Sequence, residues 1–388
     1  MEIQVPRILK PRTDSYFLFG PRGTGKTTWL KQQYPAALWL DLLSPDTFRT
    51  YSAYPERLKE LVYGNPKNKV VVIDEIQKVP DLLSVVHLLI EQKLGVQFVL
   101  TGSSARKLKR TGVDLLAGRA VRQTLHPFIA TELGNKYDFD KALQHGLLPL
   151  VYFSQTPDDV LKTYIALYIR EEVQAEGLVR NIGNFSRFLE AISFSHGAVL
   201  NISNVARECE VERKVVEGYI SILEDLLLSY RLPVFTKRAQ RGTVCHPKFY
   251  FFDTGVYRAL RPAGPLDNPD AITGTALEGL VAQHLSAWAD YNNNDTHLYF
   301  WRTKDGDEVD FVVYGKSMLY AIEVKNTGRV RNEDLSSLKM FLRNYPEATA
   351  VFLYRGKERL KVNNVLCIPL TDFLQSLVPG KIEITGIK

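Results

Sequence analysis

The sequence predicts an α/β protein of several domains, and three observations carry that prediction. At about 150 residues per domain, 388 residues are enough for two or three domains. Hydrophobic residues make up 45% and charged residues 24%, which is the balance of a globular chain with a sizeable core. In the N-terminal third, short apolar runs alternate with helical patterns. Such alternation favours a parallel sheet covered by helices.

The strands of this sheet are predicted from five apolar or β-branched runs, which occupy 15–19, 37–43, 69–73, 96–100 and 120–125. Helical patterns lie between them over 27–33, 55–62 and 81–93. Further along, helices are expected over 158–173 and 275–290, and a linker over 261–269, where prolines and glycine crowd together. A hairpin is expected over 308–325.

Composition narrows the functional classes. The formal net charge is +6 and the isoelectric point is about 9.0, which permits a nucleic-acid partner without requiring one. Three cysteines without CxxC spacing (Cys209, Cys245 and Cys367) argue against a disulfide framework or a zinc cluster. The N-terminus lacks a secretion signal, and no apolar stretch approaches the roughly 18 residues of a membrane span. We therefore expect a cytoplasmic protein with no membrane partner.

Residues 20–27 read GPRGTGKT and fit the phosphate-binding pattern GxxxxGK[ST]. Glycines let consecutive N–H groups face an anion, and the helix that follows points its N-terminal dipole at the same place. Lys26 would reach the β- and γ-phosphates of ATP, and the Thr27 hydroxyl would ligate Mg²⁺. The predicted nucleotide contacts are Gly20, Pro21, Arg22, Gly23, Thr24, Gly25, Lys26, Thr27 and Thr28.

The ends of two further predicted strands carry candidate catalytic and sensor residues for this site. The run VVVIDE ends in Asp74 and Glu75, so Asp74 is expected to hold Mg²⁺ and Glu75 to polarise the attacking water as a general base. The run FVLTGSS ends in small hydroxyl residues. Thr101 or Ser103 is the candidate sensor of the γ-phosphate, although such residues after a strand are also ordinary turn chemistry.

The segments GPRGTGKTT, VVVIDE, LTGSSARKL and LLAGRAVRQTLHPF together resemble the AAA+ superfamily, and more narrowly the prokaryotic ATPases that carry an uncharacterised nuclease-like C-terminal domain. The resemblance covers most of the chain. It implies a homo-oligomer, a hexameric ring, in which an arginine of the neighbouring subunit completes each site. Arg119 is the best match for this arginine finger, and Arg106 is the second candidate. Either could instead be a basic side chain at the surface or facing DNA.

Residues 185–252 resemble a winged helix, with helix, turn, longer helix and a basic turn between two strands. Ser203 is expected as the N-cap of the first helix of the helix-turn-helix. The predicted DNA contacts are Arg213, Lys214, Lys237, Arg238 and Arg241. The second helix also carries several acids, so a module that only packs between subunits is the alternative.

Asp310, followed by Glu323-Val324-Lys325 on the next strand, resembles the PD-(D/E)xK nuclease core. The resemblance implies that Asp310 and Glu323, helped by Glu278 on the preceding helix, chelate Mg²⁺ while Lys325 acts in catalysis. The usual proline before the first acid is absent, since Val309 stands there. The alternative is a nuclease-like domain kept for DNA binding or assembly.

The predicted organisation is a P-loop ATPase core of the AAA+ type over 1–130, a helical lid over 131–184, a winged helix over 185–252 and a restriction-endonuclease-like α/β domain over 253–388. The leading hypothesis is an oligomeric, Mg²⁺-dependent ATPase that binds or remodels duplex or branched DNA. An ATP-gated assembly switch and an ATP-regulated metal-dependent nuclease are the alternatives.

Overall fold

A computed structural model describes residues 5–103, 120–169, 173, 181–236, 246–292 and 296–379. The chain divides into two compact units. The first comprises Leu9–His126 with Leu223–Leu227, and the second comprises Met1–Ile8, Pro127–Ile222 and Leu228–Lys388. Each unit is described by itself below.

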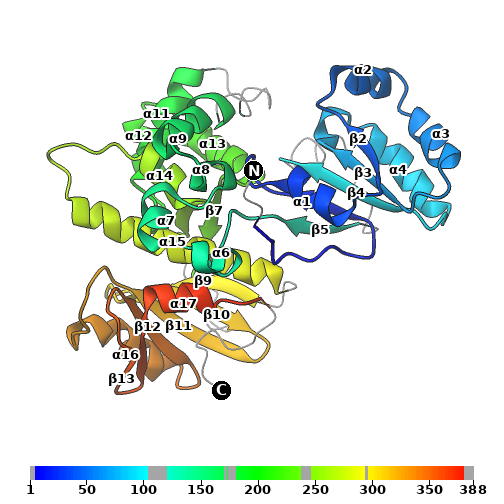
Figure 1. Ribbon diagram of the computed structural model, residues 1–388. Coiled ribbons are helices and arrows are strands. Elements are labelled where there is room, and N and C mark those ends of the chain that lie inside the picture. The colour runs from blue at the N-terminus through cyan, green and yellow to red at the C-terminus, as the bar shows by residue number, and fades with distance from the viewer. Residues whose placement is uncertain are drawn as a thin grey trace. The chain divides into compact units, whose positions relative to one another are not determined.

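The first unit is built on a five-stranded sheet in which every paired strand is parallel and the order is β2-β3-β4-β1-β5 (Figure 1). The five predicted strands are confirmed, with bounds that differ by a few residues. They are β1 (Tyr16–Phe19), β2 (Leu38–Asp41), β3 (Val70–Asp74), β4 (Gln97–Gly102) and β5 (Val121–Thr124). In this order β1 and β3 both pair with β4, so the three strand ends that carry the predicted ATP residues lie side by side.

Helices follow the strands of this sheet. They are α1 (Lys26–Gln33), α2 (Pro45–Ala53), α3 (Arg57–Gly64), the 3₁₀ turn η1 (Ile76–Lys78) and α4 (Leu82–Glu91). One face of the sheet, which includes Phe17, Ile73 and Phe98, packs on the apolar sides of α3 and α4. Helix α2 was not expected, although Pro45 at its first position, directly after Ser44, is a helix-start signal.

The second unit opens with short helices: α6 (Ala130–Leu133), the 3₁₀ turn η3 (Gly134–Lys136), α7 (Phe139–His145), α8 (Pro149–Tyr152) and α9 (Pro157–Thr163). The helix predicted over 158–173 begins as α9, but over Tyr164–Ile169 (η4) it widens into a π-helix. The described residues between 131 and 169 contain no strand, as the sequence predicts.

The region predicted as a winged helix contains α11 (Ile182–Ser193), α12 (Ile202–Glu208) and α13 (Arg213–Asp225), with a small sheet of order β6-β8-β7. Its strands are β6 (Ala198–Val199), β7 (Ser229–Leu232) and β8 (Lys248–Phe251). The expectation that Ser203 caps α12 is wrong. Asn201 is the N-cap, and its side chain accepts a hydrogen bond from the backbone N–H of Asn204 because asparagine in an extended conformation reaches the first turn.

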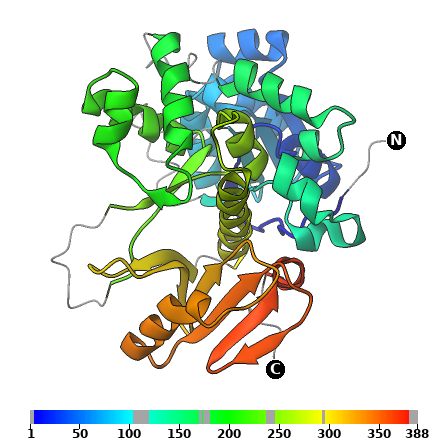
Figure 2. The ribbon, with the colours of Figure 1, turned by 90° about the vertical axis from the view of Figure 1, so that its left-hand side faces the viewer.

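The C-terminal half of this unit is a six-stranded mixed sheet of order β13-β14-β12-β11-β10-β9. The strands of this sheet are β9 (Thr296–Arg302), β10 (Glu308–Gly315), β11 (Met318–Val324), β12 (Thr349–Tyr354), β13 (Leu360–Val362) and β14 (Val365–Pro369). The helices of this half are α14 (Thr254–Leu260), α15 (Pro269–Tyr291), the 3₁₀ turn η5 (Glu333–Leu335), α16 (Ser336–Asn344) and α17 (Leu370–Ser376). The hairpin predicted over 308–325 is β10 and β11. Helix α15 is the long helix at the centre of Figure 2, and it contacts β8, β9 and β11.

Helix α15 begins six residues before the prediction. The Asn268 side chain accepts hydrogen bonds from the N–H groups of Asp270 and Ala271, and Pro269 occupies the first position. The end of the proline-rich segment is therefore a helix start rather than linker. No helix in the parts of the chain that the structure describes is long and apolar enough to cross a membrane.

Candidate functional site

The phosphate-loop pattern lies between β1 and α1. Gly23 and Gly25 have φ angles of 85° and 87°, in the left-handed region that glycine enters at no steric cost. A Cβ atom on Gly20 would lie 2.4 Å from the carbonyl oxygen of Leu125, so only glycine fits between β1 and the end of β5. Local backbone requirements therefore explain both glycines of the pattern, Gly20 and Gly25, and also Gly23 between them.

Lys26 starts α1, and its side chain turns back over the loop. Its Nζ donates to the carbonyl oxygens of Gly20 at 2.7 Å and Pro21 at 3.3 Å, and the residue is 7% exposed. An ammonium group held inside the loop by backbone carbonyls is positioned where an anionic ligand of the loop would bind. Arg22 and Thr28, the outer members of the predicted nucleotide set, are exposed.

The first turn of α1 and the ends of β3 and β4 meet through side-chain hydrogen bonds. The Thr27 hydroxyl donates to Oδ2 of Asp74 at 2.7 Å, and the Thr101 hydroxyl donates to Oδ1 of the same carboxylate. Asp74 is buried, and so is Thr101. The residues predicted as Mg²⁺ ligands and one of the two predicted sensors are thus in direct contact, although they lie up to 74 positions apart in sequence.

Glu75 follows β3 in a left-handed conformation, with a φ of 62°. Its N–H donates to Oγ1 of Thr101 at 3.2 Å, and its carboxylate accepts from the side-chain amide of Gln77. The same amide donates to Oγ of Ser103 at 3.2 Å. Gln77 therefore links the predicted general base to the second predicted sensor.

Sequence reasoning missed Gln77. The signal was weak, because a glutamine two positions beyond an acidic strand end is common. Its place depends on the left-handed Glu75 and on the 3₁₀ turn η1, which reverse the chain over the end of β4.

Several predicted residues fall outside the described part of the chain: the arginine-finger candidates Arg106 and Arg119, and the basic turn with Lys237, Arg238 and Arg241. The other two predicted DNA contacts, Arg213 and Lys214, are exposed at the start of α13. Nε of Arg213 pairs with Oε1 of Glu217 at 2.9 Å, so part of its charge is balanced within the helix.

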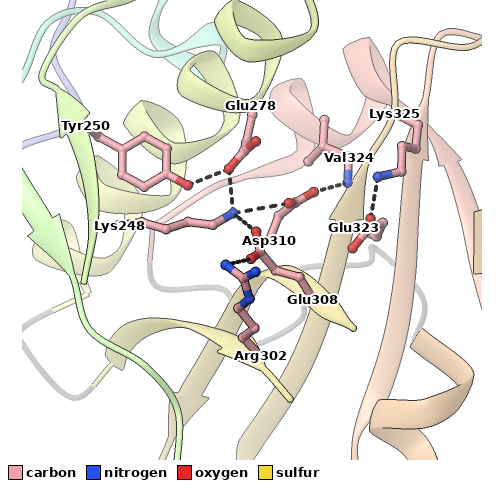
Figure 3. Close-up of polar contacts among 9 residues, drawn as sticks. All are labelled: Lys248, Tyr250, Glu278, Arg302, Glu308, Asp310, Glu323, Val324 and Lys325. Atoms are coloured by element: carbon pink, nitrogen blue, oxygen red, sulfur yellow. Dashed lines mark hydrogen bonds and ion pairs between the residues drawn. The ribbon is translucent and has the colours of Figure 1, made fainter. Parts of the chain in front are cut away.

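Two of the four predicted nuclease residues, Glu278 and Asp310, meet Glu308 in the second unit around a lysine that the sequence did not indicate. Nζ of Lys248, on β8, lies 3.0 Å from Oε1 of Glu278, 2.6 Å from Oε1 of Glu308 and 3.4 Å from Oδ1 of Asp310 (Figure 3). The Lys248 side chain is 1% exposed. Burial alone would lower its pKa, but the three carboxylates, Glu278 most strongly, outweigh burial and raise the pKa of this lysine.

The acids around Lys248 have further donors. The Tyr250 hydroxyl donates to Oε1 of Glu278 at 2.6 Å, and the Val324 N–H donates to Oδ2 of Asp310 at 2.9 Å. The pairing register of β10 with β9 shifts between Val309 and Val312, at the position of Asp310. A local irregularity of this kind re-aims a side chain. We call Lys248, Tyr250, Glu278, Glu308 and Asp310 the lysine cluster.

Glu323 and Lys325 form a separate pair beside the lysine cluster. Their Oε1 and Nζ atoms are 2.6 Å apart, and Figure 3 shows the pair on the far side of Asp310 from Lys248. Oε2 of Glu323 is buried and has no hydrogen-bond partner among the described residues. Burial, with the charge of Asp310 in addition, raises the pKa of Glu323 to about 8. Across the described ranges, no three His, Cys, Asp or Glu side chains are grouped so that they could hold a metal ion.

Comparison with known protein families finds matches to three consecutive segments of the chain. Residues 12–134 match an AAA domain. Residues 136–267 and 273–373 match two domains of unknown function, DUF8612 and DUF4143. The match to an AAA domain agrees with the parallel sheet and the phosphate loop, and it implies nucleotide binding and ATPase activity.

Two uncharacterised mycobacterial proteins are similar over almost the full chain. Mb2031c of Mycobacterium bovis and Rv2008c of Mycobacterium tuberculosis are each 26% identical over 380 residues, which is 94% of this chain and 81% of theirs. Among solved structures, AMPPCP-bound DnaA from Aquifex aeolicus covers 55% of this chain and 82% of its own, with 14% identity and a TM-score of 0.28. A score this low does not establish a shared overall fold.

Proposed function

We propose that this chain binds and hydrolyses ATP with Mg²⁺ at the edge of its five-stranded sheet, and that a homo-oligomer of it uses the turnover to act on duplex or branched DNA. The observation that carries the ATPase part is the contact of Thr27, Asp74 and Thr101 beside a glycine loop. These residues come from three chain segments, and together they make the polar site that phosphoryl transfer needs.

In the proposed site the loop N–H groups and Lys26 hold the phosphates. Lys26 exchanges its carbonyl partners, Gly20 and Pro21, for phosphate oxygens when ATP arrives. Thr27 and Asp74 are the residues that would hold Mg²⁺, since hydroxyl and carboxylate oxygens suit a hard cation. The metal, when bound, neutralises charge on the β- and γ-phosphates.

Glu75 is the proposed general base. Its carboxylate orients a water and accepts a proton from it as the water attacks the γ-phosphorus. Thr101 and Ser103 report on the γ-phosphate, because one contacts Asp74 and the other contacts Gln77, the partner of Glu75. The finger arginine, Arg119 or Arg106, comes from a neighbouring subunit, so hydrolysis depends on assembly.

The DNA part of the proposal is supported by the arrangement of α11–α13 beside the sheet β6-β8-β7, which resembles a winged helix. Arg213 and Lys214 at the start of α13 are exposed and would meet phosphate, together with Lys237, Arg238 and Arg241. The net charge of +6 is compatible with this partner.

The proposal is tested by measuring the steady-state ATPase rate without DNA and with single-stranded, duplex and four-way-junction DNA. We expect one DNA form to stimulate the wild type, and Glu75→Gln to lose about a hundredfold in rate under every condition. Glu60→Gln, the same chemical change at an exposed position of α3, is the matched control and should behave as wild type.

The outcomes separate the alternatives. A slow rate that no DNA changes would contradict DNA-coupled turnover and favour an ATP-gated assembly switch. Mg²⁺-dependent nicking that Asp310→Ala abolishes, with the ATPase rate intact, would favour an ATP-regulated nuclease in which Glu278, Asp310, Glu323 and Lys325 act.

A further inference from the structure

We infer that Lys248 is the resident cation of the lysine cluster, so that an ammonium group takes the place where the nuclease resemblance implies a divalent metal. The inference concerns the second unit and does not rest on the proposed ATPase. Its consequence is that the acidic residues of this cluster act as a structural clamp and do not support metal-dependent cleavage.

The stoichiometry of the cluster supports this assignment. A protonated lysine has three N–H donors and no acceptor. Three carboxylate oxygens, one each from Glu278, Glu308 and Asp310, lie 2.6–3.4 Å from Nζ. Nζ also lies 5.7 Å from the centre of the Phe300 ring. The ammonium group is thus enclosed by its counter-charges and an aromatic face.

Burial makes the lysine necessary for this arrangement. The side chains of Asp310 and Glu278 are 10% and 18% exposed, and that of Glu308 is 28% exposed. Carboxylates withdrawn from water to this degree need a counter-ion, and removing one partner of a buried ion pair is strongly destabilising. Arg302, whose NH1 atom is 3.6 Å from Oε2 of Glu308, supplies a second positive charge at the rim.

The donor set does not fit a divalent metal while Lys248 is in place. Mg²⁺ requires oxygen ligands at about 2.1 Å in near-octahedral geometry. The point that the acids share is the position of the lysine nitrogen, and Oδ2 of Asp310 is already bonded to the Val324 N–H. Glu323 is paired with Lys325, on the far side of Asp310 from Lys248. A metal could enter only after the lysine side chain had left.

The lysine is carried by β8, so its departure would affect more than one side chain. β8 is the central strand of the sheet β6-β8-β7, whereas the acids lie on α15 and β10. The chain just after β7 is also attached to the six-stranded sheet, since Phe235 N–H donates to the Phe300 carbonyl and Phe300 N–H donates to the Pro233 carbonyl. Lys248 therefore clamps the small sheet to the helix and sheet that carry the acids.

The test is Tb³⁺ binding, read as sensitised emission on excitation of tyrosine, because the Tyr250 hydroxyl touches Glu278. All proteins carry Asp74→Asn, which removes the only carboxylate among the two metal ligands proposed for the ATPase site, and no nucleotide is added. With Lys248 intact, we expect the same emission with and without the further change Asp310→Asn. Emission that Asp310→Asn abolishes would overturn the inference, and this comparison needs no variant of the lysine itself.

The converse variant is Lys248→Met, which keeps the side-chain length and removes the charge. We expect it to bind Tb³⁺ at least about tenfold more tightly than the parent protein and to regain melting temperature when Mn²⁺ is added. Lys316→Met, at an exposed position in the β10–β11 turn, is the matched control and should gain neither property. A folded Lys248→Met that gains no metal affinity would contradict the claim that the lysine stands in for a metal.

Discussion

Glu75 occupies a backbone conformation that an ordinary L-residue adopts at a cost of about 1 kcal/mol. The left-handed turn directs the chain from β3 into η1, where Gln77 reaches back to both Glu75 and Ser103. Strain of this kind persists only where its surroundings fix it. We regard Gln77 as a positioning residue that fixes the direction of the Glu75 carboxylate.

Replacing Gln77 tests this role. Gln77→Leu removes the amide that donates to Glu75, and one hydrogen bond to a charged group accounts for about a tenfold loss in rate. We expect kcat to fall by that factor while KM for ATP is unchanged. Steady-state kinetics with Gln33→Leu, an exposed glutamine near the end of α1, as control would measure the effect. A rise in KM at constant kcat would show that Gln77 acts in binding instead.

Residues whose role depends on local spacing were predictable, and residues whose role depends on distant contacts were not. The loop from Gly20 to Thr27 is one contiguous pattern, and Asp74 ends an apolar strand, so the sequence alone indicated both. Lys248 lies in the aromatic strand KFYF, where a lysine reads as a solvent-facing position. Its three partners come from α15 and β10, and no spacing along the chain predicts that these side chains contact the lysine.

At the scale of elements, α15 is the helix that organises the second unit, and it holds one buried histidine and packs against another. His284 lies within α15, where its Nδ1 donates to the Leu280 carbonyl at 2.8 Å and its Nε2 accepts from the Ala130 N–H at 3.0 Å. The ring of His196 lies so close to the helix that a Cβ on Gly279 would be 2.2 Å from its Nε2. A ring nitrogen that accepts a hydrogen bond carries no proton, so the bond from the Ala130 N–H requires a neutral His284 ring. Nδ1 of His196 likewise accepts from the Phe251 N–H at 3.0 Å.

These histidines predict acid sensitivity. Burial lowers the pKa of His284 to about 4 and that of His196 to about 3, against 6.5 in the unfolded chain. The unfolded state therefore takes up protons first as the pH falls. The contribution of the neutral rings to the free energy of unfolding is fully present above pH 6.5 and is lost as the pH drops from there through 4. For His284 alone the loss reaches about 3 kcal/mol.

Melting temperatures between pH 7.5 and 4.5 measure this effect. His284→Gln can donate and accept without titrating, so its melting temperature should fall less over this range than that of the wild type. His297→Gln, at an exposed position of β9, should follow the wild type. Parallel curves for the wild type and His284→Gln would show that this ring does not carry the acid sensitivity.

Helices and strands were predictable where apolar residues form a clear run or period. They were missed where only the capping residues at a helix start mark the element. The five strands of the parallel sheet and the hairpin β10–β11 stood out as apolar runs. Helix α2 was overlooked because it buries no side chain, so periodicity gave no signal there. The start of α15 was read as linker because its capping residues, Asn268 and Pro269, also suit a turn.

At the scale of the whole molecule, the chain divides into a unit built on the five-stranded parallel sheet and a larger unit that carries α11–α13 and the six-stranded mixed sheet. The predicted boundary between residues 252 and 253 lies inside the second unit, directly after β8, and the lysine cluster joins the segments on its two sides. The connection between these two segments depends on contacts between residues distant in sequence. Composition and linker-like stretches therefore could not predict it. The division of this unit into lid, winged helix and nuclease-like domain stays a prediction.

We propose that binding and hydrolysis of ATP depend on distinct side chains at the edge of the five-stranded sheet. The most direct measurement is to compare equilibrium ATP binding with ATP hydrolysis in the wild type, Glu75→Gln and Lys26→Ala. We predict that Glu75→Gln binds ATP as the wild type does but hydrolyses it about a hundredfold more slowly, and that Lys26→Ala loses both. Hydrolysis at the wild-type rate by Glu75→Gln would contradict the account.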